Sequence, residues 1–200
     1  MTIDAVVYDL GNVVLHWAPE VFYDATIGKD RRIALFDALP LHEMNDQIDR
    51  GADFRQTVYD FADQHPEWGD EIRMWHDNWL QMASPAIPES VTLLRALRAK
   101  GIPVFALTNF GVGTFEVAEK AYPFLTEFDK RYISGHMKMA KPDHDIFAAL
   151  EADCGVAPDR LLFTDDRHDN IATAKARGWN THLFEGPAGW EACLKRHGLL

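Results

Sequence analysis

The sequence predicts an α/β protein built on a doubly wound, Rossmann-like parallel sheet, with a helical cap inserted after the first strand. Two observations carry this prediction. Strand and helix patterns alternate with short connections from about residue 86 onward, which is typical of parallel sheets covered on both faces. Between residues 15 and 85, by contrast, aromatic and apolar residues recur at helical spacing without β-type alternation. We therefore expect a core of residues 1–14 and 86–200 and a cap of residues 15–85.

The first strand is the apolar, β-branched run that ends at Tyr8, and Asp9 follows it directly. The Gly11-Asn12 pair then turns the chain sharply. Asp9 is therefore expected at the carboxyl end of a core strand, which is where ligands bind in open parallel sheets. From its position alone, Asp9 has three candidate roles: metal ligand, nucleophile or turn-capping residue.

The cap segment is expected to contain some four helices. Its tryptophans Trp68, Trp75 and Trp79 are candidates for a substrate pocket, but their spacing is more typical of the cap's own hydrophobic core. His16 and Trp17 closely follow the turn after the first strand, so both are candidates for the wall of a pocket.

The remaining elements follow in order along the chain. A helix begins at Pro88 and ends before Gly101, which is a typical C-terminal glycine. The elements expected after it are a strand ending at Thr108, a helix through Phe115 and Ala118, a strand near 131–133, a helix from Pro142, a strand at 161–164, a helix ending at Gly178, a strand at 181–184 and a C-terminal helix. Strand-length apolar runs thus alternate with segments of helical spacing.

Polar side chains stand at the ends of these strands. Asp165 and Asp166 close the late strand, and Thr108 with Asn109 closes the second one. Lys141 precedes a later helix. The first and the late strand both deliver carboxylates to the same sheet edge, so their oxygens form a pocket that suits a hard cation such as Mg²⁺.

In chain order, Asp9, Thr108, Lys141 and the pair Asp165-Asp166 resemble the four motifs of the haloacid dehalogenase-like hydrolase superfamily. The resemblance covers nearly the whole chain, and four motifs in order are far more specific than any one of them. The run Lys-Pro-Asp-x-x-Ile-Phe from Lys141 and the run Asp-Asp-x-x-x-Asn-Ile from Asp165 are similar to the sugar-phosphate phosphatase branch.

The resemblance implies a Mg²⁺-dependent phosphatase in which Asp9 attacks phosphorus and forms an aspartyl-phosphate. It implies that Asp9, the backbone carbonyl of Gly11 and Asp166 hold the metal, with Asp165 as an additional or supporting acid. The chemistry of the reaction calls for the same kinds of residue. A phosphate ester repels nucleophiles, so its hydrolysis needs positive charge around the phosphoryl group.

Lys141 would neutralise part of the negative charge of the phosphoryl group. Thr108 and the backbone around Asn109 would donate hydrogen bonds to phosphoryl oxygens. Ordinary structural roles stay open at this point. Lys141 is alternatively a surface charge, Thr108 a helix N-cap and Asp165 a solvated neighbour of the site.

Gly11 departs from the family pattern, in which a second Asp two residues after the nucleophile protonates the leaving group and later activates water. The run Asp-Leu-Gly-Asn-Val from Asp9 also occurs in members that resemble phosphatases of an anomeric sugar phosphate. A missing acid matters least when the leaving group departs easily. We therefore expect a small sugar phosphate or similar metabolite with a good leaving group, such as a sugar 1-phosphate, an acyl phosphate or an aryl phosphate.

Three other functions stay open. A 2-haloacid dehalogenase would share the Asp nucleophile, but it would need neither a metal nor the pair Asp165-Asp166. A non-catalytic protein could retain the fold after losing its acid at Gly11. Phosphoryl transfer or mutase activity is the third, and Gly11 disfavours it because relatives of that kind carry an intact second Asp.

Composition limits the partners. The 200 residues carry a net charge of −11, with a pI near 5.2, so nucleic acid and anionic membrane surfaces are disfavoured. No apolar run approaches the roughly 20 residues that span a bilayer, and the N-terminus lacks a signal-peptide pattern. We expect a cytoplasmic monomer or homodimer whose partner is a small phosphorylated metabolite. Cys154 and Cys193 are expected to be buried apolar residues, with a disulfide as the alternative.

Overall fold

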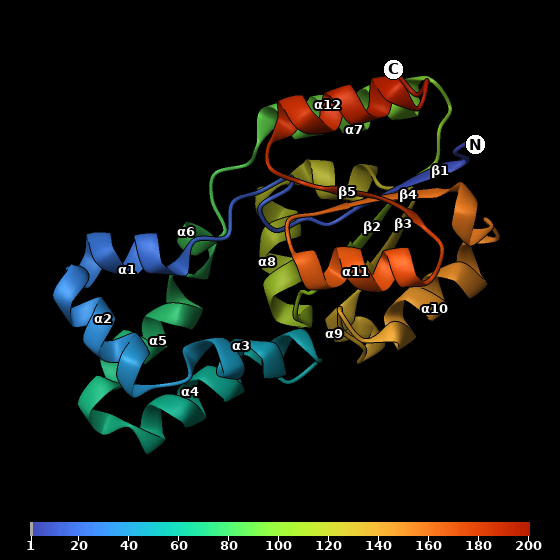
Figure 1. Cartoon of the computed structure of the whole chain (residues 1–200). Helices are drawn as coiled ribbons and strands as arrows, with labels where there is room; N and C mark the ends of the chain where they lie inside the picture. The colour runs from blue at the N-terminus through green and yellow to red at the C-terminus, as the bar shows by residue number, and fades with distance from the viewer. Residues whose placement is uncertain (1) are drawn as a thin grey trace.

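A five-stranded, all-parallel sheet forms the centre of the molecule, as expected for the predicted α/β fold (Figure 1). The computed structural model describes residues 2–200. Its strands are β1 (Ala5–Tyr8), β2 (Val104–Thr108), β3 (Lys130–Ile133), β4 (Leu161–Asp165) and β5 (Asn180–Leu183). Their spatial order is β3-β2-β1-β4-β5, so β1 is central and the chain order reverses beside it. Ligands bind at such a reversal in doubly wound folds.

Helices cover both faces of the sheet because alternate residues of each buried strand point to opposite sides. Figure 1 shows α7 and α12 above the sheet and α10 and α11 below it. The core helices are α7 (Pro88–Ala99), α8 (Val112–Ala121), α9 (Ser134–Met137), α10 (His144–Cys154), α11 (His168–Ala176) and α12 (Pro187–Arg196), and the short 3₁₀ turns are η2 (Pro123–Glu127) and η3 (Pro158–Arg160). In β1, Val6 and Tyr8 belong to one apolar cluster, whereas Ala5 and Val7 belong to the other.

The segment between β1 and α7 is helical, but it contains more helices than the four expected. Within the described chain it holds α1 (Pro19–Ile27), α2 (Lys29–Ala38), α3 (Leu41–Asp49), α4 (Phe54–Gln64), the 3₁₀ turn η1 (Pro66–Trp68), α5 (Gly69–Asp77) and α6 (Trp79–Met82). The difference arises at breaks that periodicity alone does not reveal. Gly28 has a φ of 84° between α1 and α2, and Pro40 precedes α3.

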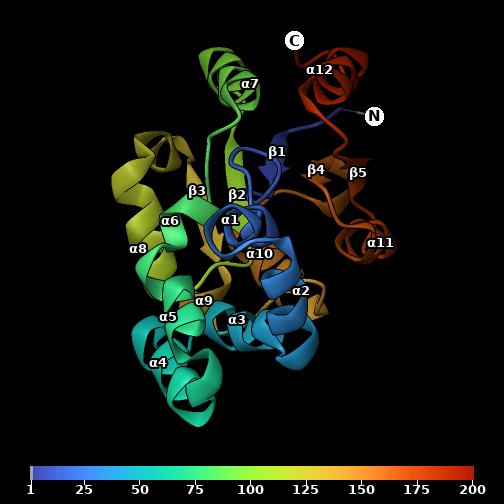
Figure 2. The ribbon, with the colours of Figure 1, turned by 90° about the vertical axis from the view of Figure 1, so that its left-hand side faces the viewer.

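These inserted helices lie beyond the carboxyl ends of the strands (Figures 1 and 2). Trp75 is fully buried and Trp79 is 4% exposed, as expected for residues of a hydrophobic core. Trp68 is partly buried against the same cluster, which continues without a break from the insert to one face of the sheet. Packing against the core therefore fixes where the insert stands over the strand ends.

Two further findings concern the chain as a whole. No helix in the described part of the chain combines the length and apolar character needed to cross a membrane. Cys154 is partly buried and Cys193 is buried, and both are free thiols in residues 2–200.

Candidate active site

The acidic groups of the first and last motifs converge at the carboxyl edge of the sheet. Asp9 follows β1, and its backbone N–H donates to the Thr164 carbonyl at 2.9 Å, which ties it to β4. Carboxylate oxygens of Asp9, Asp165 and Asp166 lie within 4.8 Å of one another. The structure thus brings Asp9 together with a pair of adjacent acids from the opposite end of the chain.

Lys141 lies inside this acidic cluster and is only 3% exposed. Its Nζ is 2.9 Å from Asp9 Oδ1 and 2.6 Å from Asp165 Oδ2, so it is not a surface charge. Burial disfavours the ammonium, but the Asp165 and Asp9 carboxylates outweigh burial and hold the pKa of Lys141 above its ordinary value. The lysine therefore presents a permanent positive charge beside Asp9.

Asp165 is fully buried, which contradicts the alternative of a solvated neighbour. Its oxygens accept hydrogen bonds from Lys141 Nζ, from the Arg167 backbone N–H at 2.8 Å and from Asn170 Nδ2 at 3.0 Å. These donors use much of the hydrogen-bonding capacity of the carboxylate. The contacts suit a residue that orients Lys141, whereas Asp166 turns toward the cavity.

Asn12 connects the first and last motifs, a role that sequence reasoning missed. Its Nδ2 donates to Asp166 Oδ2 at 3.0 Å, and its Oδ1 accepts from the Trp17 backbone N–H at 2.9 Å. The backbone of Asn12 has a φ of 54°, a left-handed conformation that asparagine tolerates better than most residues. The only signal in the sequence was the Gly-Asn turn after the strand.

Thr108 ends β2, Asn109 follows it, and both line the same cavity. Thr108 is 1% exposed and does not cap a helix, because the N-cap of α8 is Gly111. The Asn109 side chain donates to the Lys141 carbonyl at 2.8 Å and accepts from the Lys141 backbone N–H at 2.8 Å. The Asn109 amide group thus fixes the lysine backbone beside the end of β2.

The charges of the cluster fit a divalent cation. Three carboxylates and one ammonium leave two negative charges in a largely buried site. Burial raises the pKa of Asp9 to about 7, although Lys141 lowers it, and burial also raises the pKa of Asp166. A bound cation would relieve this repulsion. The carboxylate oxygens of Asp9, Asp165 and Asp166 are the kind of ligand that Mg²⁺ prefers, and the Gly11 carbonyl, on the same cavity, is a further candidate.

A cavity of about 300 Å³ opens next to these groups. One side is an aromatic wall of Trp17, Trp79 and Phe110, whose rings are in contact with centroids 5.5–5.8 Å apart. Trp17 is thus confirmed as a wall residue. His16 is exposed and does not line this cavity, but it lines a second one that shares Asn12 and Asp166 with it.

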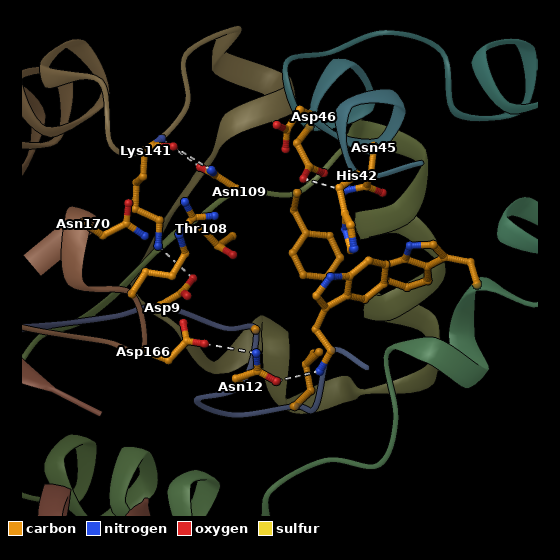
Figure 3. Close-up of a pocket in the computed structure, with 17 residues that line it drawn as sticks. Asp9, Asn12, His42, Asn45, Asp46, Thr108, Asn109, Lys141, Asp166 and Asn170 are labelled. Carbon is orange, nitrogen blue, oxygen red and sulfur yellow. Dashed lines mark hydrogen bonds and ion pairs between the residues drawn. The ribbon is translucent and has the colours of Figure 1, made fainter. Parts of the chain in front are cut away.

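The other side of the cavity is one face of α3, formed by His42, Asn45, Asp46 and Asp49. In Figure 3 the labelled residues of α3 stand across the cavity from the acids and Lys141. Sequence reasoning missed this face. Its signal was polar residues at positions i, i+3, i+4 and i+7 of an amphipathic helix, with the apolar residues on the adjacent face.

Comparison with known proteins supports the likeness seen in the motifs. A family model of haloacid dehalogenase-like hydrolases matches residues 3–178. Over most of its length the chain is similar to a sesquiterpene phosphatase from Aspergillus oryzae, with 25% identity over 193 residues, covering 94% of this chain and 93% of that protein. It is 24% identical over 209 residues to a D-ribitol-5-phosphate phosphatase from Bacteroides thetaiotaomicron, covering 92% and 93%. A stretch of 96 residues, 46% of this chain, is 33% identical to a drimenol cyclase from Aspergillus calidoustus, of which the match spans 18%.

Solved structures share the fold. A HAD family enzyme from Bacteroides thetaiotaomicron gives a TM-score of 0.78 at 24% identity, covering 97% of this chain and 99% of that one. A wild-type HAD family enzyme from the same organism, in complex with magnesium and inorganic phosphate, gives a TM-score of 0.68 at 25% identity, covering 90% and 93%.

Proposed function

Because the chain belongs to the haloacid dehalogenase-like hydrolase family, we propose that it is a Mg²⁺-dependent phosphomonoesterase that works through an aspartyl-phosphate on Asp9. One observation carries this proposal. Asp9, Asp165 and Asp166 meet around Lys141 at the end of the central strand, where a nucleophile and positive charge stand side by side. The likeness to two phosphatases over more than nine-tenths of the chain supports the same reaction class.

In the first step, Asp9 supplies the attacking oxygen. The bond between phosphorus and the leaving-group oxygen breaks while a bond from an Asp9 oxygen to phosphorus forms. Lys141 attracts the negative phosphoryl group toward Asp9, and Thr108 with the backbone around Asn109 donates hydrogen bonds to the phosphoryl oxygens. Asp9, Asp166 and the Gly11 carbonyl would hold Mg²⁺, which would supply further positive charge for the phosphoryl group.

Asp165 then acts as a supporting acid that keeps Lys141 in place, in addition to any contribution to the metal site. Its three hydrogen-bond donors hold it rigidly at the end of β4. A rigid partner keeps the ammonium from moving toward solvent, so the attraction of the phosphoryl group is available without rearrangement.

We also propose that residues 15–85 act as a cap that selects the substrate. The cap contributes the α3 face and most of the aromatic wall to a cavity of about 300 Å³, a volume that suits a small phosphorylated metabolite. Aromatic faces bind aryl groups and the apolar faces of sugar rings. The carboxylates and amide of α3 offer acceptors and donors for hydroxyl groups.

Gly11 determines the expected leaving group. It cannot donate a proton, so the first step depends on how readily the leaving group departs as an anion. The preferred substrates are therefore sugar 1-phosphates, acyl phosphates or aryl phosphates rather than unactivated alkyl phosphates. The structure has room for an acid here, because a Cβ on Gly11 would meet nothing closer than Trp17 Cβ at 3.9 Å.

The test is a panel of phosphate esters assayed with and without Mg²⁺, run in parallel on the wild type and on Asp9→Asn. We expect Mg²⁺-dependent release of phosphate, and a loss of at least about a thousandfold in Asp9→Asn. The rate should rise steeply as the leaving-group pKa falls, and Gly11→Asp should flatten that dependence. Metal-independent halide release from 2-haloacids without phosphate release would establish a dehalogenase instead.

A further inference from the structure

The cap supplies a group that the reaction needs and the core lacks. Water must lose a proton as it attacks a phosphorylated Asp9, so the second step needs a base even when a good leaving group makes an acid unnecessary in the first. Gly11 cannot provide that base, and Lys141 and Asp165 are already bound to each other. The remaining titratable side chains of the cavity include three on α3: His42, Asp46 and Asp49.

We propose that Asp49, at the carboxyl end of α3, is the general base that activates the water which hydrolyses the aspartyl-phosphate. This inference rests on the proposed function. In the step, a bond forms from the water oxygen to phosphorus, and the bond from phosphorus to the Asp9 oxygen breaks, so its electron pair returns to the Asp9 carboxylate. One water proton moves to the Asp49 carboxylate, and the other stays on the released phosphate.

Asp49 is the best placed of the three because its carboxylate is held in the cavity. Asn45 Nδ2 donates to Asp49 Oδ2 at 2.9 Å, one helical turn earlier on the same face. His42 Nε2 already pairs with Glu20 Oε1 at 3.0 Å, and Asp46 is exposed on the helix surface. Only Asp49 of these three combines a side-chain anchor with partial burial in the cavity.

The end of α3 is also fixed directly against the loops that follow β2 and β3. The Ser134 Oγ donates to the Asp49 carbonyl at 2.6 Å. Glycines make this contact possible, because a Cβ on Gly111 would lie 2.9 Å from the Ile48 carbonyl oxygen, and one on Gly51 would lie 2.7 Å from the Gly135 carbonyl oxygen. The loop after β2 carries Asn109, so the phosphoryl-binding motif and α3 form one rigid unit.

The electrostatic surroundings agree with a base that works at neutral pH. The pKa of Asp49 is raised to about 7, chiefly by burial and also by the charge of Asp46, while hydrogen bonds from the Gly111 amide and Asn45 partly oppose the rise. The charge of Asp9, which lines the same cavity, acts in the same direction. A carboxylate with this pKa accepts a proton more readily than an ordinary aspartate.

The experiment follows the two chemical steps separately with 4-nitrophenyl phosphate and Mg²⁺. In Asp49→Asn we expect a burst of one 4-nitrophenolate per active site and then a steady state slower by at least about a hundredfold. Phosphorylated Asp9 should accumulate in rapid-quench samples. Glu43→Gln, an equivalent change on the exposed side of α3, is the control and should show no burst.

Two further variants make the assignment specific. Gly11→Asp in the Asp49→Asn background should restore the steady state, because it returns a carboxylate near the reacting phosphorus. Formate should speed dephosphorylation of Asp49→Ala, which keeps the test valid if the Asn variant fails to fold. An active wild type together with unchanged dephosphorylation in Asp49→Asn would overturn this inference but leave the proposed function standing. A burst in Asp46→Asn but not in Asp49→Asn would do the same. A wild type inactive on every ester would overturn the proposed function with it.

Discussion

The two sides of the cavity are positioned by different means. On the core side, Asp9, Thr108 and Asp165 stand where parallel strands end, so the backbone ladder of the sheet fixes their positions. On the cap side, Asn45 and Asp49 stand on a helix that has no backbone pairing with the sheet and is held by side-chain packing, close glycine contacts and the hydrogen bond from Ser134. Mutations on the core side should therefore disturb the balance of buried charges. Mutations in the contacts that hold α3 should instead shift the cavity residues of that helix.

The largest effect is expected on the core side, from Lys141→Met. The change keeps most of the side-chain volume but leaves the Asp9 and Asp165 carboxylates buried without their cation. Removing one partner of a buried ion pair costs about 3–5 kcal/mol of unfolding free energy. Phosphate release should also be lost, because the attraction for the phosphoryl group disappears. Urea denaturation and turnover with 4-nitrophenyl phosphate measure the two losses.

Lys130→Met is the matched control for this variant. Lys130 pairs with Asp153 at 2.8 Å, but both side chains are well exposed to solvent, so we expect a loss of at most about 1 kcal/mol. Similar losses in the two lysine variants would contradict the view that the buried cluster depends on its single ammonium.

The same comparison explains how far the sequence could predict the molecule. Asp9, Thr108 and Asp165 were predictable because an apolar run ending in a polar residue indicates both the strand and its carboxyl edge. The burial of Lys141 could not be predicted from the residues around it, because a Lys-Pro pair before a helix has the same sequence whether the lysine is buried or exposed. The α3 face was not predicted as part of the site, because polar residues along an amphipathic helix are normally solvated. Tertiary contacts, among them the packing of Ile48 against Gly111 and the hydrogen bond from Ser134, turn that face toward the cavity.

A smaller effect is expected where the two sides meet, from Gly111→Ala. The added methyl group would come within 2.5 Å of Ile48 Cγ2 and 2.9 Å of the Ile48 carbonyl oxygen. Overpacking of this kind typically costs about 1–3 kcal/mol. Because the carbonyl belongs to the backbone of α3, Asp49 should move with it and dephosphorylation should slow. Urea denaturation and rapid-quench measurements of phosphorylated Asp9 test both expectations.

Gly189→Ala offers the control for that change. Its Cβ would meet only ordinary contacts with His182 at 3.8 Å, and it lies inside α12, where alanine is favoured over glycine by roughly 0.5–1 kcal/mol. We therefore expect a small gain in stability and unchanged kinetics. Two outcomes would show that the contact of Gly111 with α3 does not position Asp49. One is slower dephosphorylation in Gly189→Ala, and the other is a Gly111→Ala variant that is destabilised but dephosphorylates normally.

The smallest effect is expected from the ion pair that joins cap and core at the surface. Arg50 Nη2 lies 2.9 Å from Asp143 Oδ2, and the two side chains are 49% and 52% exposed. Solvent screens such a pair, so a double-mutant cycle with Arg50→Ala and Asp143→Ala should give a coupling of about 0–1 kcal/mol that falls further in high salt. Steady-state turnover should stay at the wild-type level, because buried apolar and glycine contacts hold α3 in place. A coupling well above that range, with slower turnover in both single variants, would mean that an exposed charge pair holds the cap closed.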